Sequence, residues 1–231
     1  MLPKLKLGVA GLGRAFAVVL PSFARDPRIA LVGAADPRPE ARAQFEADFQ
    51  CRVYREVADL CVDPNVEAVY VATPHQFHAE HAVAALSAGK HVLVEKPMAL
   101  SLDECRGMIE AARRSGKALV VGHSHSFDAP IALTRRIIQR GAFGRVRMIS
   151  ALDYTDFLYR PRRPEELDTA QGGGVFYNQP AHALHRRAGQ QAQDVDLVRG
   201  LVVEHAAVLR GVELFRPPRP VEEVGVVERA D

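Results

Sequence analysis

Two short groups of residues in the first half of the chain combine types that could carry chemistry. Gly11 and Gly13 form a glycine turn, and an apolar run further on ends in Glu95-Lys96-Pro97. Glycines that open a helix let backbone N–H groups approach a phosphate. A lysine that is partly buried, or lies beside a cationic ring, has a lowered pKa and can exchange a proton with a substrate. We therefore expect an anion-binding turn and a proton-transferring amine. A solvated lysine at the end of a strand is the alternative for Lys96.

An acidic residue follows the second apolar run. Asp36 can accept hydrogen bonds from a ribose 2′-hydroxyl and would repel a 2′-phosphate, which favours NAD over NADP. Arg38 follows closely and could bind such a phosphate, so NADP is not excluded. The alternative is that Asp36 caps the helix that begins after Pro37.

Two further groups follow predicted strands, Thr-Pro-His at 73–75 and Glu-Lys-Pro at 95–97. Open α/β sheets bind ligands at the carboxyl ends of their strands, so both groups are expected at the binding edge. His75, His78 and His81 recur every third residue, which could indicate a metal site. Such positions drift around a helix, however, and we expect no metal.

The segments that would position these residues alternate between apolar runs and amphipathic stretches up to residue 122. The apolar runs predict strands over residues 5–10, 29–35, 66–72, 91–94 and 118–121. The amphipathic stretches predict helices over residues 14–24, 39–49, 77–87 and 101–116, the last with a capping box of Ser101 and Glu104. This alternation is typical of an α/β fold with a doubly wound parallel (Rossmann) sheet. We assign residues 1–122 to a dinucleotide-binding domain.

After residue 122 the alternation ends. A helix is predicted over residues 128–140 and a strand over 145–153, and three glycines follow at 172–174. We expect residues 123–178 to be the beginning of a truncated α+β substrate domain, because a complete domain needs on the order of 100 residues or more.

Residues 179–231 form a tail of unusual composition. They contain no Ser, Thr, Asn, Lys, Ile, Met, Cys, Tyr or Trp, and Phe215 alone requires a codon that begins with A or T. A shifted reading frame in a GC-rich gene would impose this restriction. We expect the tail to be a frameshift product that begins near codons 175–180. A natural disordered extension, usually rich in Ser and Lys, is the alternative.

The motifs together resemble those of the glucose-fructose oxidoreductase/inositol dehydrogenase (Gfo/Idh/MocA) family. The resemblance covers about residues 5–178 and is carried by the glycine turn, Asp36, Ala72-Thr73-Pro74 with His78, and the run 89–97. It implies an NAD(P)-dependent oxidoreductase in which Lys96 is the catalytic acid/base. The implied cofactor residues are Gly11, Gly13, Arg14, Asp36, Arg38, Thr73, Pro74, His75, His78, Glu95 and Lys96.

The same resemblance implies a catalytic Asp-x-x-x-His pair in a second, mixed α/β domain. This chain has Asn178 and His182 at the corresponding spacing. An amide can orient a hydroxyl but cannot accept its proton, so Lys96 or His182 would do so. His182 lies beyond the expected frame break, where its match could be a coincidence.

Within the family, the segments at 11–16 and 122–127 resemble bacterial dehydrogenases of phthalate catabolism. Those enzymes oxidise a cis-dihydrodiol, 4,5-dihydro-4,5-dihydroxyphthalate, to 4,5-dihydroxyphthalate. Two carboxylates need cationic partners, which Arg160, Arg162 and Arg163 would supply, with a solvated loop as the alternative. A sugar or inositol dehydrogenase of the same family, and an NAD-binding remnant without turnover, are the other candidate functions.

The composition excludes several classes of protein. A net charge of +2 gives no reason to expect nucleic acid, and no apolar stretch approaches the roughly 18 residues of a membrane span. Three widely spaced cysteines are typical of reduced thiols in a cytoplasmic protein. We expect a small aromatic dihydrodiol as the partner molecule. The homo-oligomer implied for an intact family member is not extended to this chain.

Overall fold

The computed structural model describes residues 3–142 together with residues 144, 147, 164 and 168. The predicted strand at 145–153, the arginines at 160–163 and the tail at 179–231 lie outside the described residues. The domain boundaries predicted at residues 122 and 178 stay predictions.

A six-stranded sheet forms the centre of the described fold, with the order β3-β2-β1-β4-β5-β6. The strands are β1 (Leu5–Ala10), β2 (Ile29–Ala35), β3 (Arg52–Tyr54), β4 (Ala68–Val71), β5 (His91–Val94) and β6 (Leu119–Val121). Every neighbouring pair runs parallel, and each strand reaches the next through a crossover of chain. The predicted doubly wound α/β fold is confirmed.

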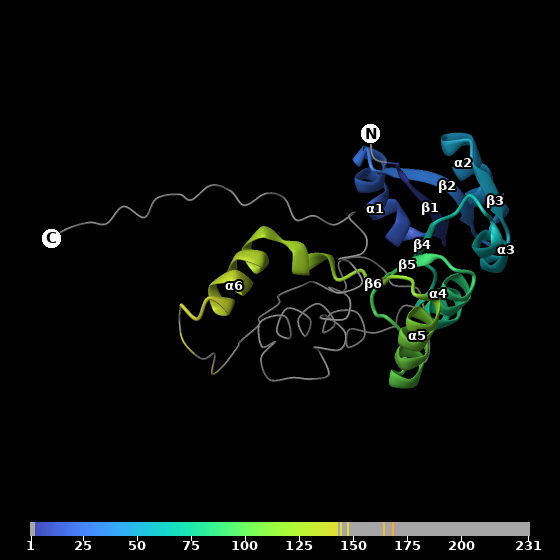
Figure 1. Cartoon of the computed structure of the whole chain (residues 1–231). Helices are drawn as coiled ribbons and strands as arrows, with labels where there is room; N and C mark the ends of the chain where they lie inside the picture. Colours follow the sequence, from blue (N-terminus) through green and yellow to red (C-terminus); the bar gives the residue numbers. More distant parts are fainter. Residues whose placement is uncertain (1–2, 143, 145–146, 148–163, 165–167, 169–231) are drawn as a thin grey trace.

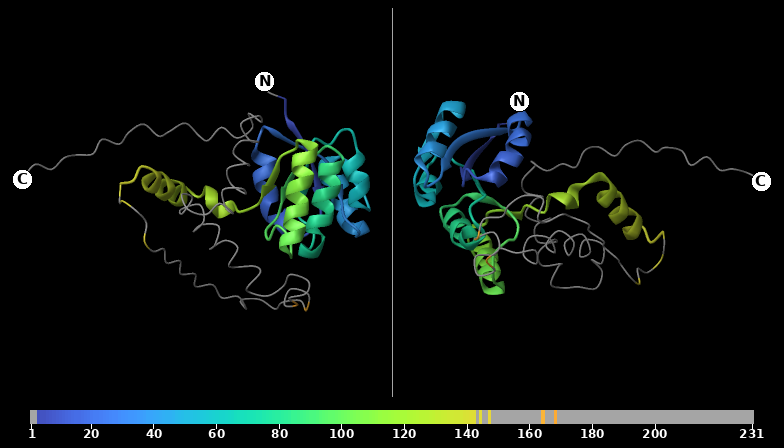
Figure 2. Two further views of the ribbon diagram at one scale, coloured as in Figure 1. Left: turned by 60° about the horizontal axis from the view of Figure 1, so that its bottom comes forward. Right: turned by 180° about the vertical axis from the view of Figure 1, so that it is seen from behind.

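Helices lie on both sides of this sheet (Figures 1 and 2). They are α1 (Arg14–Arg25), α2 (Pro39–Phe49), α3 (Val57–Val62), α4 (His78–Ser87) and α5 (Leu102–Ser115). A sixth helix, α6 (Ala129–Gln139), follows β6. Short 3-10 turns at His75–Phe77 and Ser124–Phe127 precede α4 and α6.

Alternating side chains of the strands build two hydrophobic cores. Leu7, Val9 and Tyr70 point toward α1 and α2, where they pack with Phe23 and other aromatic rings. Their strand neighbours, among them Val69, point to the opposite face and pack against α3, α4 and α5. The continuous apolar strands are explained by this double cover, since a sheet with helices on both faces has no solvated side.

Two elements were not predicted from the sequence, β3 and α3. β3 has only 3 residues and begins with the exposed Arg52, so it lacks a recognisable apolar run. α3 has 6 residues, fewer than two helical turns. The predicted strand at 66–72 is also shortened at its start. Val66 is buried, but its N–H bonds the Asp63 carbonyl in the turn after α3.

The capping box predicted for α5 is confirmed. The Ser101 hydroxyl accepts a hydrogen bond from the Glu104 N–H at 3.2 Å, and the Glu104 carboxylate accepts one from the Ser101 N–H at 3.1 Å. The same carboxylate accepts from the Leu100 N–H at 2.9 Å. This cap fixes the downstream end of the segment that joins β5 to α5.

Helix α6 lies away from the sheet in Figure 1, and no residue of α6 is buried. The helix predicted over residues 128–140 is present with nearly those bounds, but the described part of the chain buries none of its side chains. None of the described helices is long and apolar enough to cross a membrane.

Candidate functional site

The predicted site residues gather at one edge of the sheet. The glycine turn follows β1, Asp36 follows β2, Thr73 follows β4 and Lys96 follows β5. The crossovers from β1 lead first toward β2 and β3, and the later ones lead to the other side, toward β5 and β6. This reversal next to β1 is where doubly wound sheets open a crevice for a ligand.

Gly11 brings the turn after β1 into direct contact with the chain after β4. Its φ is +93°, and a Cβ at this position would lie 2.7 Å from the Ala72 carbonyl oxygen and 2.9 Å from the Thr73 nitrogen. Both the left-handed backbone and the close approach require glycine. The turn is therefore fixed against the β4 loop by the absence of a side chain.

Gly13 has the opposite surroundings. It is the N-cap of α1, and a Cβ there would have no atom within 4 Å. The exposed Arg14 begins the helix beside this open space. Free N–H groups at a helix N-terminus attract a phosphate, and the open space would let one approach. The turn thus fits the pyrophosphate of a dinucleotide.

The third position of the glycine pattern is Phe16, where glycine or alanine is usual. Its ring is buried and lies 5.9 Å from the ring of Phe45, centroid to centroid. Phe16 therefore replaces close helix–strand contact with aromatic packing between α1 and α2.

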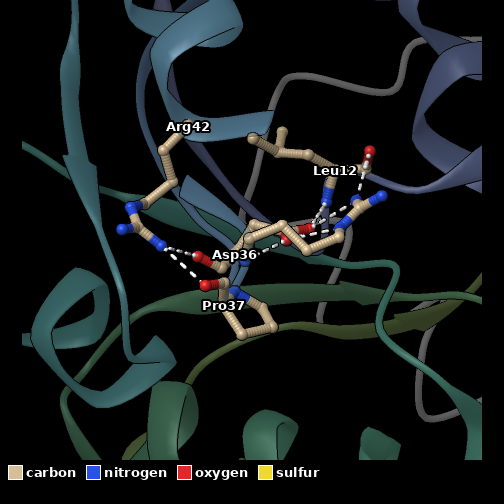
Figure 3. Close-up of polar contacts among 5 residues, drawn as sticks. Leu12, Asp36, Pro37 and Arg42 are labelled. Atoms are coloured by element: carbon tan, nitrogen blue, oxygen red, sulfur yellow. Dashed lines mark hydrogen bonds and ion pairs between the residues drawn. The ribbon is translucent and has the colours of Figure 1, made fainter. Parts of the chain in front are cut away.

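Asp36 presents an almost fully buried carboxylate at the end of β2, with 5 % of its side chain exposed. The Leu12 N–H donates to it at 2.8 Å, and the Arg38 side chain donates at 2.9 and 3.0 Å (Figure 3). Burial alone would raise the pKa of Asp36, but the hydrogen bonds from Arg38 and Leu12 outweigh it and lower the pKa. Asp36 is therefore held as an anion that faces the glycine turn.

Arg38 forms an ion pair with that anion, and 51 % of the Arg38 side chain is exposed. Its guanidinium also donates to the Leu12 carbonyl at 3.1 Å, so it joins the end of β2 to the glycine turn. Asp36 does not cap helix α2, which was the alternative role considered for it. The N-cap of α2 is Arg38, without a side-chain cap, and Asp36 accepts the Arg38 N–H at 3.0 Å.

Lys96 is partly buried one residue beyond the last ladder bond of β5, in which the Glu95 N–H bonds the Val71 carbonyl at 2.9 Å. Burial lowers the pKa of the Lys96 ammonium, and the charge of Glu95 opposes that shift. A lowered pKa enlarges the fraction of neutral amine at neutral pH, which is the form that accepts a proton.

Glu95 is fixed by a residue that the sequence analysis missed. The Tyr70 hydroxyl donates to one Glu95 oxygen at 2.7 Å, and the Lys96 N–H donates to the other at 3.3 Å. Burial and the Glu95 charge raise the pKa of Tyr70, so its hydroxyl stays a donor. The signal was available: a tyrosine in the otherwise apolar β4 needs a polar partner when its strand is buried.

His78 is fully buried at the start of α4 and connects two loops of the site. Its Nδ1 lies 2.8 Å from the Pro97 carbonyl oxygen, and its Nε2 lies 2.9 Å from the Thr73 carbonyl oxygen. Burial lowers the pKa of the ring to about 4, although both carbonyls act in the opposite direction. With both nitrogens engaged by the chain itself, any part that His78 has in cofactor binding is indirect.

The other predicted histidine positions do not converge on one point. His81 Nδ1 lies 3.0 Å from the Thr73 hydroxyl, and the His75 ring lies 5.5 Å from that of His78, edge to face. Within residues 3–142, no three His, Cys, Asp or Glu side chains are grouped as a metal site would require.

Five predicted residues lie outside the described residues: Arg160, Arg162, Arg163, Asn178 and His182. The structure therefore brings together the proposed cofactor residues and Lys96, and leaves the substrate side of the prediction untested.

Comparison with known proteins gives one family model, described as an oxidoreductase family with an NAD-binding Rossmann fold, which matches residues 5–123. Among curated proteins, 1-carboxy-3-chloro-3,4-dihydroxycyclohexa-1,5-diene dehydrogenase of Comamonas testosteroni is 55 % identical over 181 residues, or 78 % of this chain. An inositol 2-dehydrogenase of Saccharopolyspora erythraea is 34 % identical over 202 residues, or 81 % of this chain.

Two crystal structures show the same fold. A protein of Bordetella bronchiseptica RB50, described as a dehydrogenase, gives a TM-score of 0.77 at 44 % identity over 82 % of this chain and 50 % of its own. The WlbA dehydrogenase of Bordetella pertussis, in complex with NADH and UDP-GlcNAcA, gives 0.68 at 28 % identity over 81 % of this chain and 55 % of its own.

The matches differ in length from this chain. The chain spans 46 % of the Comamonas testosteroni protein and 59 % of the Saccharopolyspora erythraea protein. It thus corresponds to about half the length of the relatives that it matches.

Proposed function

The chain belongs to the Gfo/Idh/MocA oxidoreductase family with its NAD-binding Rossmann fold, and from that premise we propose that it acts as an NAD-dependent dehydrogenase of a carboxylated cis-dihydrodiol. The observation that carries the proposal is the 55 % identity with the Comamonas testosteroni enzyme. The name of that enzyme describes a cyclohexadiene ring that carries one carboxyl group, one chlorine and two hydroxyl groups.

The described residues fit the cofactor at each part of the binding edge. The open space at Gly13 suits a pyrophosphate, and the anionic Asp36 suits a ribose diol. Thr73 and Glu95 follow the ends of the neighbouring strands β4 and β5, where a nicotinamide would lie. We assign cofactor binding to Gly11, Gly13, Arg14, Asp36, Arg38, Thr73, Pro74, His75, His78, Glu95 and Lys96, with His78 acting through the loops it joins.

Oxidation of an alcohol removes a hydride from carbon and a proton from oxygen. NAD, when bound, accepts the hydride. The neutral Lys96 amine accepts the hydroxyl proton and becomes an ammonium, and burial favours the neutral form before the reaction. The ketone produced from a cyclohexadiene diol enolises to a catechol, and the gain in aromaticity makes the oxidation favourable.

For the substrate itself we propose 4,5-dihydro-4,5-dihydroxyphthalate, which would be oxidised to 4,5-dihydroxyphthalate. The three arginines at 160–163 would bind its carboxylates bidentately, and Asn178 and His182 would orient the hydroxyl. A substrate with a single carboxylate, as in the Comamonas testosteroni enzyme, is the nearest competitor.

A second candidate is a sugar or inositol dehydrogenase. The 34 % identity with an inositol 2-dehydrogenase over 202 residues supports this candidate. Such a substrate needs neutral hydrogen-bonding groups, and the arginines at 160–163 would have no carboxylate to bind. A third candidate is a chain that binds NAD without turnover.

Titration of the full chain with NADH, followed by an assay of NADH production, separates the three candidates. We expect turnover with the dicarboxylated dihydrodiol to exceed that with the monocarboxylated diol and with myo-inositol. Lys96→Met should lower kcat by about 10²- to 10⁴-fold, while Lys117→Met, on the loop before β6, should leave it unchanged. Binding of NADH without turnover of any diol would refute the dehydrogenase proposal and support the third candidate.

We also propose a small molecule as the partner and the cytoplasm as the location. The three cysteines that the structure describes, Cys51, Cys61 and Cys105, are all free thiols, which is typical of a reducing compartment. Assembly into a homo-oligomer is proposed for full-length relatives and not for this chain.

A further inference from the structure

We infer that His78 is a positioning residue for Lys96: its Nδ1–H donates a hydrogen bond to the Pro97 carbonyl and thereby holds the Lys96 segment against α4. The inference rests on the proposed function insofar as Lys96 is the proton acceptor. The geometry itself concerns only the described residues around the buried ring.

The ring has two partners of the same kind. Backbone carbonyl oxygens only accept hydrogen bonds, and they lie 2.8 Å from Nδ1 and 2.9 Å from Nε2. A neutral imidazole has one N–H, so it can donate to only one of the two carbonyls. The neighbouring rings of His75 and His81 act with burial to lower the pKa of His78, and so to keep the ring neutral.

The Thr73 side of this pair is held without His78. Ala72, the residue before it, donates its N–H to the Ala10 carbonyl at 2.8 Å, in the last bond between β4 and β1. The Thr73 hydroxyl lies 3.0 Å from His81 Nδ1, and the Thr73 nitrogen packs against Gly11. Thr73 would thus keep its place if its carbonyl accepted no hydrogen bond from the ring.

The Pro97 side depends more on the ring. The β5 ladder ends at the Glu95 N–H, and the capping box of α5 begins to hold the chain again at Leu100. Pro97 has no N–H, so its carbonyl is the backbone group through which α4 can hold it. Between these two anchors Met98 is buried in the core and the Lys96 N–H bonds Glu95, and a proton on Nδ1 adds the bond that ties the Pro97 backbone, next to Lys96, to α4.

The element that carries His78 is suited to this task. α4 is packed into the core through Ala82, Ala85 and Leu86, all fully buried. A ring held by such a helix has little freedom to move. The ring joins the Lys96 segment to the β4 loop, which in turn contacts the glycine turn at Gly11. His78 thereby sets where Lys96 lies relative to the proposed cofactor.

The first test reads the ring directly. In the full chain labelled with 15N-histidine, long-range 1H–15N spectra at neutral pH report which ring nitrogen carries the proton. The nine histidines are separated by comparison with the His78 variants below. A proton on Nδ1, with or without a second one on Nε2, supports the inference. A proton on Nε2 alone would overturn it, because the bond would then go to Thr73.

The second test uses a matched pair of variants. Asparagine places its amide where Nδ1 lies, and glutamine places its amide where Nε2 lies. His78→Asn can therefore keep the bond to Pro97 and lose that to Thr73, whereas His78→Gln does the reverse. His91→Gln is the control, since His91 also bonds a backbone group, the Ala118 N–H at 3.0 Å, but at the start of β5.

The readout is the Lys96 side chain in chains labelled with 13C-lysine, whose five lysine signals are assigned with Lys96→Arg. His78→Gln should shift the Lys96 signal and move its titration midpoint upward, toward that of an exposed lysine. His78→Asn and His91→Gln should shift both much less. Equal shifts in the two His78 variants, or none in either, would contradict a positioning role.

Neither test requires the cofactor or turnover. A wild-type chain that fails to bind NADH would refute the proposed function, while the ring proton and the Lys96 shift would still decide the role of His78. If only one His78 variant folds, its Lys96 signal is compared with that of the wild-type chain and of His91→Gln.

Discussion

The two halves of the binding edge are built in different ways. The turn after β1 works through the absence of side chains: Gly11 allows contact with the β4 loop, and Gly13 leaves open space at the start of α1. The segment after β5 is held by hydrogen bonds from side chains of other elements. Tyr70 of β4 fixes Glu95, and His78 of α4 contacts the Pro97 carbonyl.

This difference teaches what each half can tolerate. A glycine turn fails when atoms are added to it, since added atoms clash with backbone or fill the ligand space. A lysine segment held by buried polar partners fails when a partner is removed, since the remaining group is left without its hydrogen bond. Four predictions test this contrast, from the largest expected effect to the smallest.

The glycine turn should respond strongly to one added methyl group. Gly11→Ala forces a left-handed alanine and a contact 2.7 Å from the Ala72 oxygen, so we expect a loss of about 2–5 kcal/mol in the free energy of unfolding. Gly13→Ala should change stability little, since nothing lies within 4 Å, but should weaken NADH binding. Urea denaturation and NADH titration measure both. Equal stability of the two variants would contradict the packing argument.

The His78 ring should make stability depend on pH. Its pKa is lowered from the model-compound value of 6.5 to about 4, so the unfolded chain binds this proton more readily than the folded one. The stabilisation is complete above pH 6.5 and is lost as the pH falls toward 4. It amounts to on the order of 3 kcal/mol. Urea denaturation of the wild type and of His78→Gln should therefore give curves that converge as the pH falls. Parallel curves would exclude a buried neutral ring.

Removal of the Asp36 charge should act on cofactor choice. Asp36→Asn loses the ion pair with Arg38 and replaces one of the two acceptor oxygens by an NH2 donor, so NADH affinity should fall by about 10- to 100-fold. NADPH affinity should fall less or rise, because the repelling charge is gone and Arg38 is released. Titration of both nucleotides measures the ratio. Arg38→Ala in the same background should remove any gain for NADPH.

Loss of the Tyr70 hydroxyl should disturb the Lys96 segment more than the glycine turn. Tyr70→Phe removes the bond to Glu95 and should cost about 1–3 kcal/mol of stability, because a partly buried carboxylate oxygen loses its donor. NADH binding through the glycine turn should change little by comparison. Tyr54→Phe is the control, since it removes a similar 2.7 Å bond to Asp63 away from this segment. A shift of the Lys96 signal in both variants would contradict the assignment of Tyr70 to this segment.

Much of this architecture follows from local sequence. The strands at 5–10, 29–35 and 91–94 were predicted with the bounds that the structure has, since their apolar runs end at glycine, proline or charged residues. The capping box of α5 and the glycine turn are likewise short patterns whose geometry hardly depends on the rest of the chain. The placement of Asp36 and Lys96 at one edge followed from the parallel order of the strands.

Tertiary structure decided how the chemistry-bearing side chains are held. The aromatic packing of Phe16 on Phe45 and the Tyr70–Glu95 bond each join residues too far apart in sequence for a local pattern to show. β3 and α3 are too short to give a recognisable pattern of their own. His78 illustrates the reason. The resemblance to the family marked it as a site residue, but only the packing of α4 against the strands brings both ring nitrogens to the carbonyls of Thr73 and Pro97. The sequence thus determined which residues lie at the edge, and burial determined their protonation and their partners.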